Sequence, residues 1–184
     1  MAISLQKGQR VQLGLAKAGV GLGWDPNEGG GTEYDLDTSI FLVGTDGKLP
    51  ADEFFVFYNN QQSPDGAVRS SGDDRTGGKS DGDDETLFIE FAKLDSRVGE
   101  MVVVVTIHEA DKRRQNFGQV RNSFIRIYDS DTNEEICKYE LDEDFSIETA
   151  IEFGRFYKKD GGWRFQAVGK GNAGGLQHFV AKFT

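Results

Sequence analysis

The sequence predicts a mainly β protein, a sandwich of two packed sheets with one or two short helices and long acidic loops. Short segments rich in β-branched and aromatic residues recur along the 184 residues. Turn signals separate them, supplied by 24 glycines and only three prolines. This pattern favours a β-sandwich over a βαβ fold, in which helices would alternate with strands. We expect residues 1–184 to form one domain.

Nine segments carry the strand signal, namely residues 10–15, 34–43, 54–58, 86–92, 101–107, 122–129, 135–141, 162–168 and 176–183. The first alternates apolar and polar residues, and the second ends before a turn signal at Asp46 and Gly47. The fifth, MVVVVTI, is apolar almost throughout and is expected to be a central strand buried on both faces. The sixth and seventh flank a polar turn and are expected to form a hairpin.

Residues 146–159 predict a helix. Ser146 is suited to cap the N-terminus, and Glu148 lies in the first turn. Apolar and small residues recur at helical spacing on one side, and two glycines at 161 and 162 follow as a stop signal. Residues 108–119 are expected to hold a second, shorter helix.

Composition excludes several classes of protein. A net charge of −10 argues against binding nucleic acid, which needs a basic surface, and against direct binding to anionic lipid. The longest apolar run, residues 101–107, is too short to span a bilayer, and the first residues hold no apolar leader. A single cysteine excludes an internal disulfide framework. We expect a cytoplasmic protein that does not insert into membranes.

Catalytic constellations are missing from the sequence as well. The two histidines, His108 and His178, lie far apart, and no nucleophile-elbow motif accompanies them. Cys137 falls within an expected strand and is interpreted as a small core residue. We therefore expect the protein not to be an enzyme.

An acidic segment, residues 63–85, lies between two expected strands. Its seven carboxylates are Asp65, Asp73, Asp74, Asp81, Asp83, Asp84 and Glu85, opposed by three basic residues. The strands hold its ends, and its Asp-Gly steps favour tight turns, in which side-chain and backbone oxygens converge as a hard divalent cation requires. Calcium is the preferred interpretation. A solvated acidic loop, magnesium and a basic protein partner are the alternatives.

Four further positions are candidate ligands. Strand alternation places Asp35 and Asp37 on one face, where two carboxylates repel unless a cation or a base lies between them. Asn60 adds a neutral oxygen at the end of the strand before the acidic segment. Asp25 lies upstream, beside a glycine-rich stretch.

Another acidic stretch, residues 129–140, imitates the spacing of an EF-hand loop. Glu134 stands where such a loop needs glycine, and the flanks predict strands instead of helices. A hairpin turn is therefore favoured over a calcium loop.

A series of motifs, in order along nearly the whole chain, resembles the TerD family of tellurium-resistance and stress proteins. They include GLGWD at 21–25, YDLDTSIFLV at 34–43, DGDDE at 81–85 and GGWRFQAVGKGNAGGL at 161–176. The resemblance implies a calcium-binding β-sandwich in a bacterial cytoplasm, linked to tellurite, phage or other stress resistance and without enzymatic activity. It implies metal roles for Asp35, Asp37 and the acids between Asp65 and Glu85, without telling which of them bind directly.

Our main hypothesis is a binding module that takes up one or two calcium ions, two in our prediction. It would present a calcium-ordered acidic surface to other proteins of a stress-resistance complex, membrane-associated complexes included. The alternative is a calcium-dependent membrane-surface module of C2-like type. Such a module would expose apolar loop tips, and residues 63–85 have none. Reduction of tellurite by the lone Cys137 is disfavoured, because catalytic partners are missing.

Overall fold

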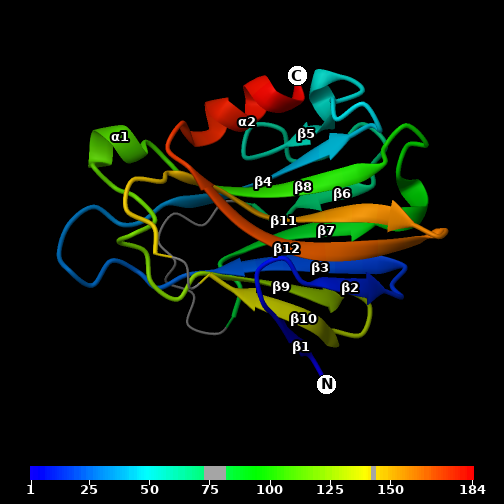
Figure 1. The fold of residues 1–184 in the computed structure, drawn as a ribbon, viewed down its shortest axis with the longest axis horizontal. Coiled ribbons are helices and arrows are strands. Elements are labelled where there is room, and N and C mark those ends of the chain that lie inside the picture. The colour runs from blue at the N-terminus through cyan, green and yellow to red at the C-terminus, as the bar shows by residue number, and fades with distance from the viewer. Residues whose placement is uncertain (73–81, 142–143) are drawn as a thin grey trace.

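The computed structural model describes residues 1–72, 82–141 and 144–184. Within them the chain forms two six-stranded sheets that pack against each other (Figure 1). The first sheet has the order β1 (Ile3–Leu5), β10 (Glu135–Glu140), β9 (Phe124–Asp129), β3 (Lys17–Gly23), β7 (Glu85–Glu90) and β6 (Val68–Ser70). The second has the order β2 (Arg10–Leu13), β12 (Gly162–Asn172), β11 (Ala150–Lys159), β8 (Glu100–Ile107), β4 (Leu36–Val43) and β5 (Phe55–Val56). The predicted mainly β sandwich is confirmed.

Four short helical segments complete the described fold, namely η1 (Asp52–Phe54), η2 (Phe91–Lys93), α1 (Ala110–Arg113) and α2 (Gly175–Phe183). Among the described strand pairs, β1 and β10 run parallel and the others run antiparallel. The short helix predicted within residues 108–119 is confirmed as α1. No helix in the described part of the chain is long and apolar enough to cross a membrane.

The main core lies between the two sheets, and a second apolar cluster lies outside the second sheet. Strand β8 pairs with β11 on one side and β4 on the other, and its valines are buried on both faces. The outer face is covered because Phe179 and Phe183 of α2 pack against Phe41 and Val102. The predicted central, doubly buried strand is confirmed, as is the hairpin of β9 and β10.

The predicted helix at 146–159 is wrong, because residues 150–159 form strand β11. Five consecutive residues, Ala150 to Gly154, are buried, whereas a helix on a protein surface buries one side only. β11 pairs with both β8 and β12 and therefore lies in the interior of its sheet. A Cβ atom on Gly154 would collide with the Phe165 ring, so this glycine serves close packing between strands.

The predicted strand at 176–183 is also wrong, because these residues form most of α2. Leu176, Phe179, Val180 and Phe183 follow the helical spacing i, i+3, i+4 and i+7. All four pack onto the outer face of the second sheet. The segment therefore buries one apolar side as a helix does, while its other side meets solvent.

Strand β3 carries no apolar run and was not expected. Its glycines at 19, 21 and 23 alternate along one face, and a Cβ atom on any of them would collide with a neighbouring side chain. Those neighbours are Tyr128, Asp83 and Phe124. The glycines therefore let large side chains of adjacent segments lie directly over the strand.

Cys137 is buried in β10, as the sequence predicted for a small core residue. Burial, and to a lesser degree the charge of Glu135, raises the pKa of its thiol to about 12. The thiolate is the reactive form of cysteine, so a thiol with this pKa stays protonated and inert at neutral pH.

Candidate metal site

The acidic end of the sandwich is built where β4 and β7 begin. The backbone amide of Thr38 in β4 donates a hydrogen bond of 2.8 Å to Glu85 Oε2 in β7 and thereby links the two sheets. Beside it, the amide of Trp24 donates to Asp84 Oδ2 at 3.0 Å. The indole of Trp24 then donates to the carbonyl of Tyr34 at 3.1 Å, just before β4. These bonds bring residues 34–38 and 84–85 together across the interior.

Four carboxylates are buried at this end. The exposed fractions are 5% for Asp35, 7% for Asp37, 3% for Asp84 and 6% for Glu85. None of the four is without a partner. Carboxylates are almost never this buried unless they are paired or bind a metal, so this end of the sandwich is the candidate site.

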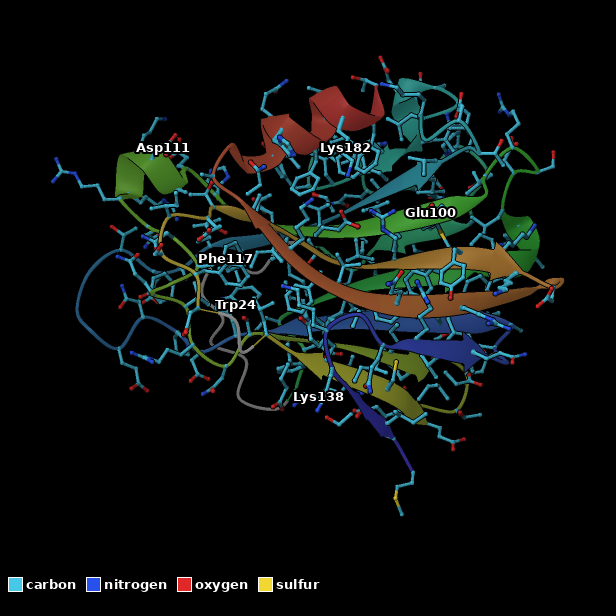
Figure 2. All side chains as sticks on the ribbon, in the orientation of Figure 1. Trp24, Glu100, Asp111, Phe117, Lys138 and Lys182 are labelled. Carbon is cyan, nitrogen blue, oxygen red and sulfur yellow. The ribbon has the colours of Figure 1, made fainter. Side chains whose placement is uncertain are left out.

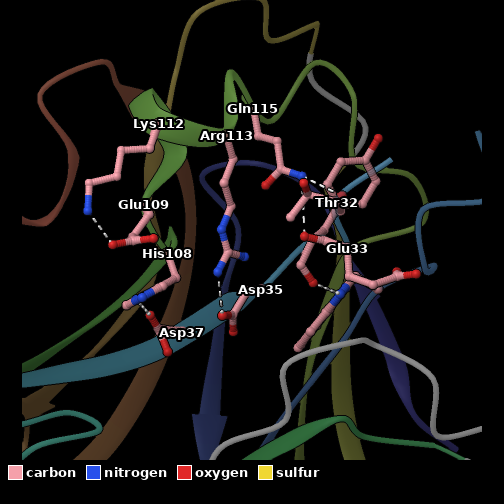
Figure 3. A network of polar contacts seen from close by, with 11 residues as sticks. Thr32, Glu33, Asp35, Asp37, His108, Glu109, Lys112, Arg113 and Gln115 are labelled. Carbon is pink, nitrogen blue, oxygen red and sulfur yellow. Dashed lines mark hydrogen bonds and ion pairs between the residues drawn. The ribbon is translucent and has the colours of Figure 1, made fainter. Parts of the chain in front are cut away.

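A cleft of about 400 Å³ opens beside Asp35 and Asp37, and both side chains line it. Figure 3 shows Arg113 pointing from α1 towards Asp35, with Nη2 to Oδ2 at 3.5 Å. His108 Nδ1 lies 3.5 Å from Asp37 Oδ2. Tyr58 also lines the cleft and stands edge-on to the His108 ring. The prediction that Asp35 and Asp37 share one face agrees with this arrangement.

Helix α1 is held over the cleft by its flanking residues. Glu109 and Arg114, before and after α1, both have left-handed backbone conformations, with φ of 50° and 52°. The side-chain amide of Gln115 donates to the carbonyls of Thr32 at 2.7 Å and Glu33 at 3.2 Å. These contacts tie α1 to the segment that precedes β4 (Figure 3). Arg113 and His108 were not among the predicted site residues, because no local pattern shows that they would lie beside Asp35 and Asp37.

Three predicted ligands have local structural partners and do not line this cleft. Asp25 Oδ2 accepts a hydrogen bond of 2.6 Å from Asn122. Asn60 donates through its side-chain amide to the carbonyls of Glu53 and Phe55, at 3.0 and 2.7 Å.

Asp65, the third of them, stabilises a turn. Its Oδ1 accepts from the Ser63 hydroxyl at 2.6 Å and from the Ala67 amide at 2.9 Å. Its Oδ2 accepts from the Asp95 amide, also at 2.9 Å.

Asp83 faces the outer side of the first sheet. Its two oxygens accept hydrogen bonds from Arg126 at 2.7 and 2.9 Å, and this pairing raises the pKa of Arg126. The remaining predicted ligands, Asp73, Asp74 and Asp81, lie outside the described residues.

The donor chemistry fits a hard cation. Carboxylate oxygens dominate, and two neutral oxygens of the same region, Thr38 Oγ1 and Gln115 Oε1, are buried without a hydrogen bond inside the described ranges. Calcium accepts such a mixture of charged and neutral oxygens. Over those ranges, however, no three His, Cys, Asp or Glu side chains stand close enough together to hold a metal ion. The described residues thus offer part of a ligand set.

The fold and this site define a class of protein, a β-sandwich with buried carboxylates gathered at one end. The TerD domain family matches residues 1–183, and the chain belongs to this family. The resemblance predicted from the motifs is confirmed.

Relatives cover the chain end to end. It is 47% identical to the tellurium resistance protein TerD of Serratia marcescens, with 100% of this chain and 97% of that protein aligned. It is 46% identical to general stress protein 16U of Bacillus subtilis, with the same coverage. A solved structure of a protein of unknown function matches with a TM-score of 0.73 at 26% identity, over 94% of this chain and 99% of that one. The family is thus one of tellurium-resistance and stress-response proteins, and these names are not those of enzymes.

Proposed function

We propose that this protein is a non-enzymatic stress-response protein that binds calcium at the acidic end of its sandwich and presents the ordered surface to partner proteins. The observation that carries the proposal is the burial of Asp35, Asp37, Asp84 and Glu85 at one end, where β4 and β7 of opposite sheets begin. The charge of a bound calcium ion would offset the repulsion of these carboxylates.

The residues that would hold calcium are Asp35 and Asp37, which line the cleft, and Asp84 and Glu85, which are buried at the same end. The acids of the segment before β7 stay proposed ligands, and their number is the reason we keep two ions in the proposal. Binding would draw this segment against residues 34–38, because both would share the cation. A partner protein would then meet a fixed acidic surface instead of a set of repelling charges.

Arg113 acts in this proposal as an internal counter-ion. It places a positive charge beside Asp35, and the side chains of Arg113 and Asp35 are only 22% and 8% exposed. Because calcium and Arg113 would compete for the same carboxylate, calcium has to displace the guanidinium.

Calorimetric titration with calcium tests both the binding of calcium and the counter-ion role of Arg113. We expect the wild type to bind two ions, and Arg113→Met to bind calcium about fivefold more tightly, since an ion pair of this exposure is worth about 1 kcal/mol. Lys112→Met is the matched control: it removes a cation from the same helix, but Lys112 pairs with Glu109 and does not line the cleft. No binding heat from the wild type would refute calcium binding. Equal affinities for wild type and Arg113→Met would refute the counter-ion role alone.

A second candidate function is calcium-dependent binding to a membrane surface, and one observation favours it. Ile147 is 67% exposed, in the segment that leads into β11. β11 begins at Ala150 opposite Thr106, which pairs with Asp37. An exposed apolar side chain thus lies at the acidic end of the sandwich.

Sedimentation with phosphatidylserine vesicles tests this candidate. If it is correct, the protein sediments with vesicles in calcium and stays in solution with chelator. Ile147→Ser should then weaken sedimentation, because it removes the apolar contact, while Ile3→Ser on edge strand β1 should not. Sedimentation that does not depend on calcium, or that is unchanged in Ile147→Ser, would exclude this second candidate function.

A further inference from the structure

The outer face of the second sheet is divided into an apolar half and a charged half. Helix α2 covers β4 and β8, while β2 and the start of β12 lie away from it (Figure 1). On the charged half an open groove of about 440 Å³ crosses β2, β12, β11 and the start of β8. Figure 2 shows Glu100 on this face, with Lys182 of α2 at its upper border.

Strand register explains why cations gather in the groove. Gln166 in β12 stands opposite Arg155 in β11 and Arg10 in β2. Two residues earlier, Arg164 stands opposite Tyr157. Side chains two apart on a strand, and those directly opposite, share a face. These five side chains, together with Lys159 two residues after Tyr157, therefore point into the same groove.

The positive charges of the groove are unevenly neutralised. Arg155 pairs with Glu100 at 2.6 Å and with the buried Glu152. Within the described residues, Arg164 forms an ion pair only with Asp160, at 3.7 Å. Arg10 and Lys159 make no ion pair anywhere in the described part of the chain. A surplus of positive charge therefore remains on this face, although the net charge of the protein is −10.

A bound anion would remove the repulsion among these cations. Like charges on neighbouring strand positions destabilise a sheet, and the planar guanidinium donors of arginine match the oxygens of a phosphoryl group. Arg155 is already held in place by two glutamates, so its geometry is prepared before a ligand arrives. Tyr157 and Gln166 add neutral hydrogen-bonding groups to the same groove.

We propose that this groove binds the phosphoryl group of a small soluble ligand, through Arg10, Arg164 and Lys159. The surplus charge suits one such group and not a polyanion, because the rest of the molecule is strongly acidic and would repel a long chain of phosphates. The inference does not depend on the calcium site, which lies at the end of the sandwich where β4 and β7 begin.

Titration with inorganic phosphate, followed by amide NMR at constant ionic strength against chloride, tests the proposal. We expect saturable shifts confined to β2, β11 and β12. Arg10→Gln combined with Arg164→Gln should weaken phosphate binding at least tenfold, since charge-assisted hydrogen bonds are lost. If the double variant is unstable, Arg10→Gln alone replaces it as the test, because Arg10 lies on an exposed edge strand. This single variant should also weaken phosphate binding.

Arg69→Gln is the control, because it removes an arginine from β6 of the other sheet and should leave phosphate binding unchanged. A second arm offers vesicles of phosphatidylcholine with a phosphoinositide, in chelator, and we expect no sedimentation. Shifts that chloride reproduces, or that survive in the double variant, would overturn the proposal. Binding to the vesicles without binding to free phosphate would overturn the assignment to a soluble ligand.

Discussion

Calcium at a hundred times its dissociation constant is expected to stabilise the folded protein by about 2.7 kcal/mol. For a chain of this length, that corresponds to a rise in melting temperature of about 5–10 °C. The reason is that the unfolded chain does not bring residues 35–37 and 84–85 together, so only the folded form offers the site. Thermal unfolding followed by circular dichroism, with calcium and then with excess chelator, measures the effect.

Asp37→Asn should remove most of this calcium-dependent rise, because it takes a charged ligand out of the cleft without changing its shape. Asp131→Asn removes the same charge from an exposed position in the β9–β10 hairpin and should leave the rise intact. A wild-type melting temperature that stays constant across millimolar calcium would contradict the proposed function. A full rise in Asp37→Asn would place the calcium site elsewhere.

Arg155→Met is expected to lower the free energy of unfolding by about 3 kcal/mol. Glu152 is only 2% exposed, and Arg155 is its nearest cation, with Lys182 at 3.8 Å as the second. Burial acts to lower the pKa of Arg155, but Glu152 and Glu100 outweigh it and raise that pKa, so the guanidinium stays charged throughout the stable pH range. Without Arg155, Glu152 becomes a buried carboxylate with one distant partner. Urea unfolding gives the free energy directly.

Two further variants separate the loss of the ion pair from a loss of packing. Lys182→Met removes the distant, 46% exposed partner and should cost less than about 1 kcal/mol. Arg155→Met combined with Glu152→Gln should recover much of the stability, because no charge is then left buried. If the double variant is as unstable as Arg155→Met alone, lost packing and not the unpaired charge explains the effect.

Sequence reasoning succeeded where one local pattern had one structural meaning. The run of valines indicated correctly that β8 is buried on both faces. The polar turn between two strand-like segments indicated the hairpin of β9 and β10. Sequence reasoning failed where two patterns overlapped. Residues 150–159 satisfy a helical spacing, but β8 and β12 pair with both edges of this segment by hydrogen bonds, and residues 150–154 are buried on both faces, so the segment forms a strand.

The sequence identified the acidic residues as candidate ligands, but it did not predict which of them would be buried together. Asp35, Asp37, Asp84 and Glu85 were all candidate ligands, and the structure gathers them at one end. Asp83 directly precedes Asp84 and looked equivalent, yet it lies over Gly21 on the outer face, paired with Arg126. Both residues precede β7, so the bend of the backbone at residues 82–84, and not strand alternation, sets the direction of each carboxylate.

By itself, the sequence determined that this protein is a mainly β, strongly acidic chain of the TerD family. It also showed carboxylates concentrated in residues 63–85 and paired at Asp35 and Asp37. Those properties reside in composition and in short motifs. Only the tertiary structure decided that Thr38 and Glu85 meet across the interior and that Arg113 and His108 arrive beside Asp35 and Asp37. It also decided that cations from β2, β11 and β12 share a groove. These contacts join residues far apart in the chain, and sheet register, which no local pattern encodes, sets which of them meet.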